Sequence, residues 1–175
     1  MATHYYLFDM DGMLFFTDEL NNESYNLALI ENNFNPIRGE KRITREIVKD
    51  FYPEIDEQKM AVLINKKQDY FTKNICRVQK NDFLFDILSK TERKNCILWT
   101  SAEKKRVDSM IEEFGLQRFF GRVIFSTKKH ISKDIDHICE EFICTREQLC
   151  AFENDVLVAK ELKEDNVGCL LFIRP

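Results

Sequence analysis

Four apolar runs of this 175-residue chain end in side chains that could do chemistry. In chain order the four groups are Asp9 with Asp11, Thr100 with Ser101, the lysines of residues 126–133, and Glu153, Asn154 and Asp155. Carboxylates bind a hard divalent cation such as Mg²⁺, and hydroxyl, backbone N–H and ammonium groups stabilise the charge of a phosphoryl group. If the four groups lie together, they suit magnesium-assisted phosphoryl transfer. A carboxylate alone would be repelled by a phosphate dianion, so both a metal and an ammonium group are needed nearby.

The apolar runs themselves predict the strands of a buried sheet. They span residues 5–8, 96–99, 122–125, 149–152 and 167–172. Apolar and polar residues do not alternate in them, which is typical of strands covered on both faces. Helical spacing of apolar residues separates the runs, at residues 107–114, 135–142 and 158–162. This rhythm predicts an α/β fold with a doubly wound, Rossmann-like parallel sheet, in which ligands bind beyond the carboxyl ends of the strands.

The long segment between the first two strands predicts a separate helical unit. Its helical patterns cover residues 22–30, 44–51 and 56–75, and a further helix at 82–91 leads back to the sheet. Breaks at Asn35-Pro36, Arg38-Gly39 and Tyr52-Pro53 divide these patterns. About 60 residues is far longer than an ordinary crossover between strands. We therefore expect a small all-helical cap at residues 19–80 and a core made of residues 1–18 and 81–175.

Composition excludes several classes of protein and partner. The 30 acidic and 26 basic residues give a formal charge of −4, so we expect no nucleic-acid partner. No apolar run approaches the roughly 18 residues of a membrane span. The first residues lack the pattern of a signal peptide, and none of the six cysteines forms a Cys-x-x-Cys pair. These features indicate a cytoplasmic protein with reduced cysteines and argue against a zinc site.

The segment from Asp9 to Thr17, Asp-Met-Asp-Gly-Met-Leu-Phe-Phe-Thr, resembles the D-x-D-G-x-L-x-x-[T/D] loop of the haloacid dehalogenase (HAD) superfamily. Asp18-Glu19 and residues 24–28 resemble the branch related to β-phosphoglucomutase, in which a helical cap follows that loop directly. Residues 98–102 resemble the second motif of the family and residues 152–155 the fourth. The similarity covers nearly the whole chain and keeps the order of the motifs.

The resemblance implies a role for each matching position. Asp9 would be the nucleophile that forms an aspartyl-phosphate, and Asp11 the acid that protonates the leaving oxygen and then activates water. A carboxylate oxygen of Asp9 and the backbone carbonyl of Asp11 would bind Mg²⁺. Thr100 would hydrogen-bond the phosphoryl group, with Ser101 beside it.

Two positions depart from the pattern of the branch. The lysine motif is usually Lys-Pro, and this chain has no proline there. We expect Lys133 to take this role, because it opens a helix 20 residues before Glu153, with Lys129 as the alternative. The fourth motif is usually Glu-Asp, but here it is Glu153-Asn154. Both residues are expected at the metal, with Asp155 as the alternative to Asn154, and the neutral amide should weaken Mg²⁺ binding.

Together these features predict a Mg²⁺-dependent phosphatase that acts on a small phosphorylated metabolite. A phosphomutase would use the same residues, and a phosphonatase would need a Schiff-base lysine in the cap. Lys66 and Lys67 are the only hint of that chemistry, and their spacing favours a solvated helix face. A degenerate HAD fold that serves only as a binding module is the non-enzyme alternative. The sequence leaves the substrate and the oligomeric state open.

Overall fold

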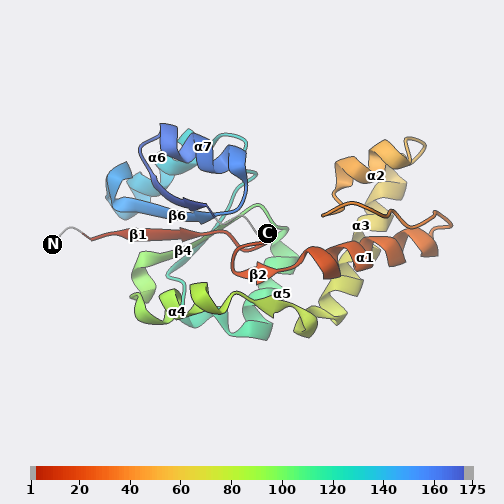
Figure 1. Cartoon of the computed structure of the whole chain (residues 1–175), viewed down its shortest axis with the longest axis horizontal. Coiled ribbons are helices and arrows are strands. Elements are labelled where there is room, and N and C mark those ends of the chain that lie inside the picture. The colour runs from red at the N-terminus through yellow and green to blue at the C-terminus, as the bar shows by residue number, and fades with distance from the viewer. Residues whose placement is uncertain (1–2, 172–175) are drawn as a thin grey trace. The chain divides into compact units, whose positions relative to one another are not determined.

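The structure is a computed structural model that describes residues 3–171. The chain divides into two compact units (Figure 1). The larger unit consists of the chain up to Phe15 together with the chain from Lys80 onward, and the smaller unit spans Phe16–Gln79. The sequence analysis expects the smaller unit at residues 19–80. Because each unit has its own buried core, each is described by itself.

A five-stranded sheet with the order β5-β4-β1-β6-β7 forms the centre of the larger unit. All neighbouring strands are parallel, and their bounds are β1 Tyr5–Phe8, β4 Cys96–Thr100, β5 Arg122–Phe125, β6 Leu149–Glu153 and β7 Gly168–Leu171. Every residue of β4 is buried, whereas β5 lies at an edge and is half-exposed. The expectation that all strands are covered on both faces is therefore wrong for β5. The predicted doubly wound parallel sheet is confirmed.

Helices cover both faces of this sheet (Figure 1). They are α4 Asp82–Lys90 and α5 Lys104–Phe114 on one face, and α6 Ile131–Phe142 and α7 Val156–Glu164 on the other. Short 3-10 helices precede or follow them at η2 Arg93–Asn95, η3 Leu116–Arg118 and η4 Arg146–Gln148. The face under α6 and α7 buries Leu7 and Trp99 against Ile135 and Leu162. Leu7 and Phe8 point to opposite faces, because successive side chains of a strand alternate.

The smaller unit is built of helices α1 Asp18–Glu31, α2 Arg45–Phe51 and α3 Glu57–Lys73 and the 3-10 helix η1 Ile75–Arg77. Asparagine side chains of α1 fix the segment between α1 and α2. Asn21 Nδ2 donates to the carbonyl of Ile43 at 2.9 Å, and Asn22 Oδ1 accepts from the N–H of Ile43 at 2.7 Å. Asn26 pairs in the same two-sided way with the backbone of Ile37. These bonds satisfy backbone groups that no helix satisfies.

Two very short strands, β2 Phe15–Phe16 and β3 Gln79–Lys80, pair in a second sheet. The sequence does not predict them, because two residues carry no recognisable period. In the described residues no helix is long and apolar enough to cross a membrane.

Lys67 corrects one expectation from the sequence. Lys66 has a half-exposed side chain and pairs with Glu31 at 3.3 Å, as a solvated helix face requires. Lys67 is instead only 6% exposed. Its Nζ lies 5.0 Å from the ring centroid of Tyr25 and 5.4 Å from that of Phe71. The two aromatic rings attract the ammonium group, which explains how a lysine is accommodated in this interior.

The C-terminus of α6 allows a direct test of backbone strain. Ile143 has φ 51° and is 94% exposed, so it adopts the left-handed region without burying its side chain. A β-branched residue is strained there, and glycine is not. Ile143→Gly should therefore raise the free energy of unfolding by about 1 kcal/mol, measured by urea denaturation. Gly115 holds the same left-handed position after α5, so Gly115→Ala should lower it by about 1 kcal/mol. A lower free energy of unfolding in Ile143→Gly than in wild type would contradict this account.

Candidate active site

Asp9 lies at the carboxyl end of the central strand of the sheet. Strand β1 pairs with β4 on one side and with β6 on the other, and the Asp9 N–H donates to the Phe152 carbonyl at 3.1 Å. Asp9 is 7% exposed. The chain then turns at Gly12, whose φ of 77° suits glycine and whose N–H donates to the Phe15 carbonyl at 2.7 Å. The turn fixes Asp9 and Asp11 in one short loop above the sheet.

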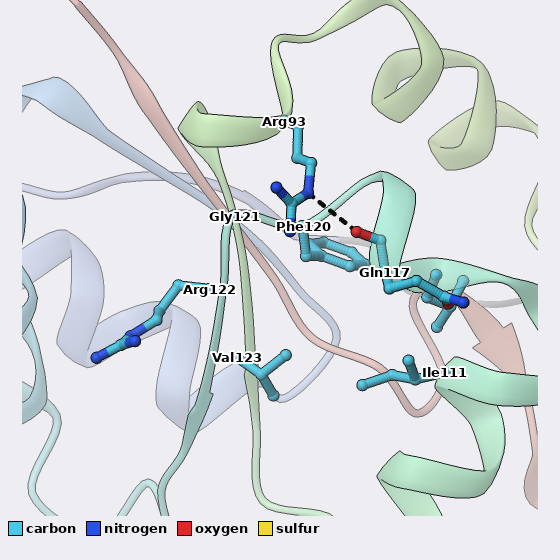
Figure 2. Close-up of a pocket in the computed structure, with 8 residues that line it drawn as sticks. Arg93, Ile111, Gln117, Phe120, Gly121, Arg122 and Val123 are labelled. Carbon is cyan, nitrogen blue, oxygen red and sulfur yellow. Dashed lines mark hydrogen bonds between the residues drawn. The ribbon is translucent and has the colours of Figure 1, made fainter.

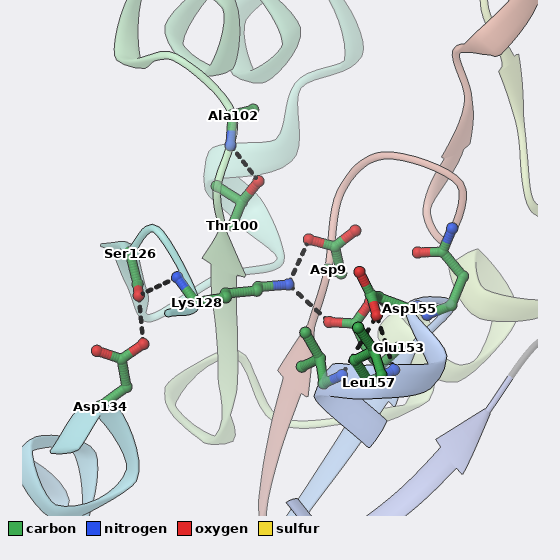
Figure 3. Close-up of polar contacts among 11 residues, drawn as sticks. Asp9, Thr100, Ala102, Ser126, Lys128, Asp134, Glu153, Asp155 and Leu157 are labelled. Carbon is green, nitrogen blue, oxygen red and sulfur yellow. Dashed lines mark hydrogen bonds and ion pairs between the residues drawn. The ribbon is translucent and has the colours of Figure 1, made fainter. Parts of the chain in front are cut away.

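Lys128 joins the carboxylates of two strands (Figure 3). Its Nζ lies 2.7 Å from Asp9 Oδ1 and 2.7 Å from Glu153 Oε2. The side chains of Lys128, Asp9 and Glu153 are 7%, 9% and 2% exposed, so the three charges are almost fully withdrawn from water. The ammonium group also lies 4.5 Å from the Trp99 ring. A buried ammonium group therefore bridges two buried carboxylates of neighbouring strands.

The sequence favours Lys133 for this position, but the structure brings Lys128 to Asp9 and Glu153. Lys133 lies in the first turn of α6 and Lys129 in the preceding loop, and both are exposed. Lys128 reaches inward because it has φ 53° and its N–H donates to Ser126 Oγ at 2.8 Å. Ser126 in turn is held by a hydrogen bond to Asp134. A tight turn directly after β5 thus selects the lysine, and no proline is needed to make it.

Thr100 lies at the carboxyl end of β4, and Figure 3 shows it at the same edge of the sheet as Asp9 and Lys128. It is 1% exposed, and its Oγ1 accepts from the N–H of Ala102 at 3.2 Å. The hydroxyl therefore still has a proton to donate. Ser101, the next residue, is exposed.

Glu153 organises the loop that leads from β6 into α7. Its Oε1 accepts from the N–H of Asn154 at 2.8 Å and from that of Asp155 at 3.0 Å. Asp155 Oδ1 accepts from the N–H groups of Leu157 and Val158, at 2.8 and 3.3 Å. Asp155 thus caps α7, which gives this carboxylate a structural role.

The Asn154 side chain lies against the loop that holds Asp11. A Cβ on Gly12 would stand 2.3 Å from the nitrogen of the Asn154 amide, so a larger residue there would displace that amide. In the orientation that satisfies its hydrogen bonds, the Asn154 side-chain nitrogen donates to the Asp11 carbonyl at 3.2 Å and to Glu153 Oε1 at 3.3 Å. The amide therefore links two oxygens that the resemblance assigns to the neighbourhood of a metal.

These oxygens also suit Mg²⁺. Neighbouring ligands of an octahedral Mg²⁺ are roughly 3.0 Å apart. The Asn154 side-chain atom lies at similar distances, 3.2 Å from the Asp11 carbonyl and 3.3 Å from Glu153 Oε1. A half-turn of the Asn154 amide would present its oxygen in place of its nitrogen, and Asp9 supplies a carboxylate nearby. Among residues 3–171 no three His, Cys, Asp or Glu side chains gather into a metal site. The candidate donors at Asp9, Asp11 and Asn154 are all oxygens, which fits Mg²⁺ better than a softer metal.

The charge of the site depends on Asp9. Burial raises the pKa of Asp9 from its ordinary 3.8 to about 7, although Lys128 lowers it and Glu153 adds to the rise. Burial by itself would lower the pKa of Lys128, but the charges of Asp9 and Glu153 outweigh it and raise that pKa. Lys128 therefore stays charged, and Asp9 is the group that titrates.

Arg106 is a member of the site that the sequence did not reveal. It lies in the first turn of α5, is 5% exposed, and pairs with the carboxylate of Asp11. The available signal was the run Lys104-Lys105-Arg106, which places three cations where a helix dipole favours acids.

A sequence profile of the haloacid dehalogenase-like hydrolases matches residues 6–156. The chain belongs to this family. The resemblance to the HAD superfamily is thus confirmed, while the branch related to β-phosphoglucomutase stays a prediction. No curated protein sequence matches the chain.

Solved HAD structures share the fold at low sequence identity. A predicted phosphoglycolate phosphatase from Haemophilus somnus has a TM-score of 0.81 and 15% identity, over 95% of this chain and 84% of that one. CbbY from Rhodobacter sphaeroides, in complex with phosphate, has a TM-score of 0.78 and 19% identity, over 97% and 86%. A HAD hydrolase from Entamoeba histolytica has a TM-score of 0.75 and 14% identity, over 95% and 82%.

A concavity lies away from these residues (Figure 2). It has a volume of about 300 Å³. Its lining residues are Arg93, Ile111, Leu116, Gln117, Phe120, Gly121, Arg122 and Val123. Arg93 Nε donates to the Gln117 carbonyl at 2.9 Å across it. Because it lies where β4 and β5 begin, and not where they end, it contains none of the site residues of this HAD fold.

The raised pKa of Asp9 predicts how stability depends on pH. A carboxyl whose pKa is higher in the folded chain binds its proton more tightly there, so it contributes stability that is lost as pH rises from 3.8 to about 7. Asp9→Asn removes this effect. In EDTA the variant should be more stable than wild type at pH 8, by on the order of a few kcal/mol, and equal to it at pH 4. Thermal melts at both values measure this, with Asp86→Asn, an exposed partner of Lys90, as the control. An equal difference at both pH values would contradict the buried-carboxyl account.

Proposed function

We propose that this HAD hydrolase is a Mg²⁺-dependent phosphatase, a phosphoric monoester hydrolase that acts on a small phosphorylated metabolite through an aspartyl-phosphate. The observation that carries the proposal is the buried contact of Lys128 with Asp9 and Glu153. The ammonium group holds the nucleophile in place and supplies positive charge where a phosphoryl group would arrive. Stability alone does not require this buried group of charges, because apolar residues could replace all three at little cost. Its presence therefore supports a chemical role.

In the first step the Asp9 carboxylate forms a bond to phosphorus while the bond from phosphorus to the substrate oxygen breaks. Asp11 gives its proton to that leaving oxygen, so an alcohol departs and an aspartyl-phosphate remains. In the second step Asp11 takes a proton from water, whose oxygen attacks phosphorus and releases Asp9 and inorganic phosphate. Lys128 and the Thr100 hydroxyl donate to the phosphoryl oxygens in both steps.

Mg²⁺ supplies further positive charge to the phosphoryl group when bound. Asp9, the Asp11 carbonyl and Asn154 would hold it, with Glu153 fixing Asn154 and Lys128 around them. Asp9 contributes one charge and the two amide-type oxygens contribute none, so several water molecules should complete the shell.

The remaining assignments follow from the family. Residues 19–80 would be the helical cap that this family carries, and the substrate would be a phosphate ester. The solved relatives support this reaction class, because one is named as a predicted phosphoglycolate phosphatase and another binds phosphate. A phosphomutase would return the phosphate to the substrate, and a binding module would turn over nothing.

Hydrolysis of p-nitrophenyl phosphate with and without Mg²⁺ tests the proposal directly. Wild type should release inorganic phosphate only with the metal, and Lys128→Met should lower kcat/KM by about 10³-fold because the arriving charge loses its partner. Lys133→Met removes a lysine from the same stretch and should leave kcat/KM within about 2-fold, because Lys133 is exposed. Wild type without turnover on this ester and on a panel of sugar and nucleotide phosphates would leave the binding module as the function. Similar losses in the two variants would contradict the role of Lys128.

Asn154 predicts an unusual metal dependence. Asn154→Asp adds an anionic ligand, so it should lower the Mg²⁺ concentration that gives half-maximal activity by about 10-fold. Asp155→Asn keeps a good helix cap and should leave that concentration unchanged. Titration of activity with Mg²⁺ measures both. An unchanged half-maximal concentration in Asn154→Asp would show that position 154 does not bind the metal.

A further inference from the structure

Lys128 reaches its partners by crossing the end of a neighbouring strand, and Trp99 lies where it crosses. The lysine follows β5, whereas Asp9 follows β1 and Glu153 ends β6, and β4 lies between β5 and β1 in the sheet. The side chain therefore extends past β4 (Figure 3). Trp99 belongs to β4, and Lys128 Nζ lies over its ring at 4.5 Å from the centroid. The ring thus supports the extended lysine.

Packing alone does not explain a tryptophan at this position. Trp99 is 1% exposed and lies in the core under α6 and α7, beside aliphatic residues such as Leu7 and Ile135. Within residues 3–171 its indole N–H has no hydrogen-bond partner. A buried tryptophan usually finds an acceptor for this group, and burying the N–H without one is costly. An aliphatic residue would fill the space without that cost, so the ring supplies a property that aliphatic residues lack.

That property is the negative electrostatic potential of the indole face, which attracts cations more strongly than the rings of phenylalanine or tyrosine do. The attraction is larger where water is excluded, and the Lys128 side chain is only 7% exposed. The ring therefore replaces part of the water that the ammonium group has lost. Without it, water entering beside β4 would solvate that group, and the flexible side chain would withdraw toward the solvent.

We propose that Trp99 is a positioning residue that holds Lys128 in this extended position, where its ammonium group meets the phosphoryl group. The catalytic part of this inference rests on the proposed phosphatase function. When Asp9 bonds to phosphorus, its carboxylate becomes a neutral acyl group and attracts Lys128 less. The indole ring does not react, so its attraction for the ammonium group is the same before and after that bond forms. Trp99 therefore keeps Lys128 beside the phosphoryl oxygens in both steps.

The contact between the ring and the ammonium group can be tested without substrate. Trp99 is the one tryptophan among the 175 residues, so biosynthetic replacement by a trifluorinated tryptophan changes this side chain alone. Fluorine withdraws electron density from the face of the ring and weakens its attraction for a cation, while the shape stays similar. In the full-length protein, fluorination should lower the melting temperature by about 3 °C in wild type and by less than about 1 °C in Lys128→Met.

Kinetics on p-nitrophenyl phosphate with Mg²⁺ test the positioning. Trp99→Leu should lower kcat/KM by about 30-fold because the lysine withdraws, and Trp99→Phe, which keeps an aromatic face, by about 3-fold. Ile97→Ala is the matched control, since Ile97 is 0% exposed, belongs to the same core and lies on the same face of β4 two residues earlier. It should lower the melting temperature about as much as Trp99→Leu but keep kcat/KM within about 3-fold of wild type.

Action through Lys128 has its own signature. The variant that combines Trp99→Leu with Lys128→Met should be no slower than Lys128→Met alone, because the ring then has no ammonium group to hold. Thermal melts identify variants that fail to fold. If Lys128→Met is one of them, the fluorinated wild type supplies the comparison, since its ring fills the same space and its kcat/KM should still fall by about 3-fold.

The outcomes separate the inference from the function beneath it. The same change of melting temperature on fluorination in wild type and in Lys128→Met would show that the ring does not hold the ammonium group, which overturns the inference. So would equal losses of kcat/KM in Trp99→Leu and Ile97→Ala, additive losses in the double variant, or an unchanged kcat/KM in the fluorinated protein. Wild type that hydrolyses no phosphate ester contradicts the proposed function, and the melting temperatures then still decide whether Trp99 holds Lys128.

Discussion

The buried contact of Lys128 with Asp9 and Glu153 is the constraint on which the site depends. Two carboxylates this close and this deeply buried would repel each other and strongly disfavour folding. The ammonium group at 2.7 Å from each offsets that repulsion but leaves one negative charge. That charge is balanced either by a proton or by a cation, and burial together with the charge of Glu153 raises the pKa of Asp9 to about 7. The order of the sheet makes the contact possible, since β1 and β6 are neighbours and the turn after β5 returns to them.

A second constraint is the close approach of two loops. Gly12 has no side chain and a left-handed φ, and the Asn154 amide fills the space where a Cβ would be. An aspartate at position 154 would place another negative charge beside Glu153 and the Asp11 carbonyl. The amide instead donates to both oxygens. The change from Asp to Asn in the fourth motif is thus accommodated by hydrogen bonds that hold the loops together when no cation does so.

The sequence predicts the sheet and its helices because their apolar patterns are local. It points to Asp9 and Asp11 because these two residues and Gly12 form a short motif that can be recognised without any tertiary contact. It does not identify Lys128, because the choice among neighbouring lysines depends on a single residue with a positive φ. The sequence does not identify Arg106 for a different reason. Its partner Asp11 lies 95 positions away, and only the packing of α5 brings the two residues together. Tertiary contacts of this kind override what the local pattern favours.

The formal charge of the site limits which ligands it can attract. When all three are ionised, Asp9, Asp11 and Glu153 carry three negative charges, and Lys128 and Arg106 carry two positive ones, so the site then has a formal charge of −1. A phosphate dianion would be repelled by that charge, and the proposed Mg²⁺ reverses it to +1. An aspartate at position 154 would return the total to zero and weaken the attraction for the dianion. Asn154 therefore lowers the affinity for the metal and raises the affinity for the phosphate, and the guanidinium of Arg106 contributes to the same balance through its ion pair with Asp11.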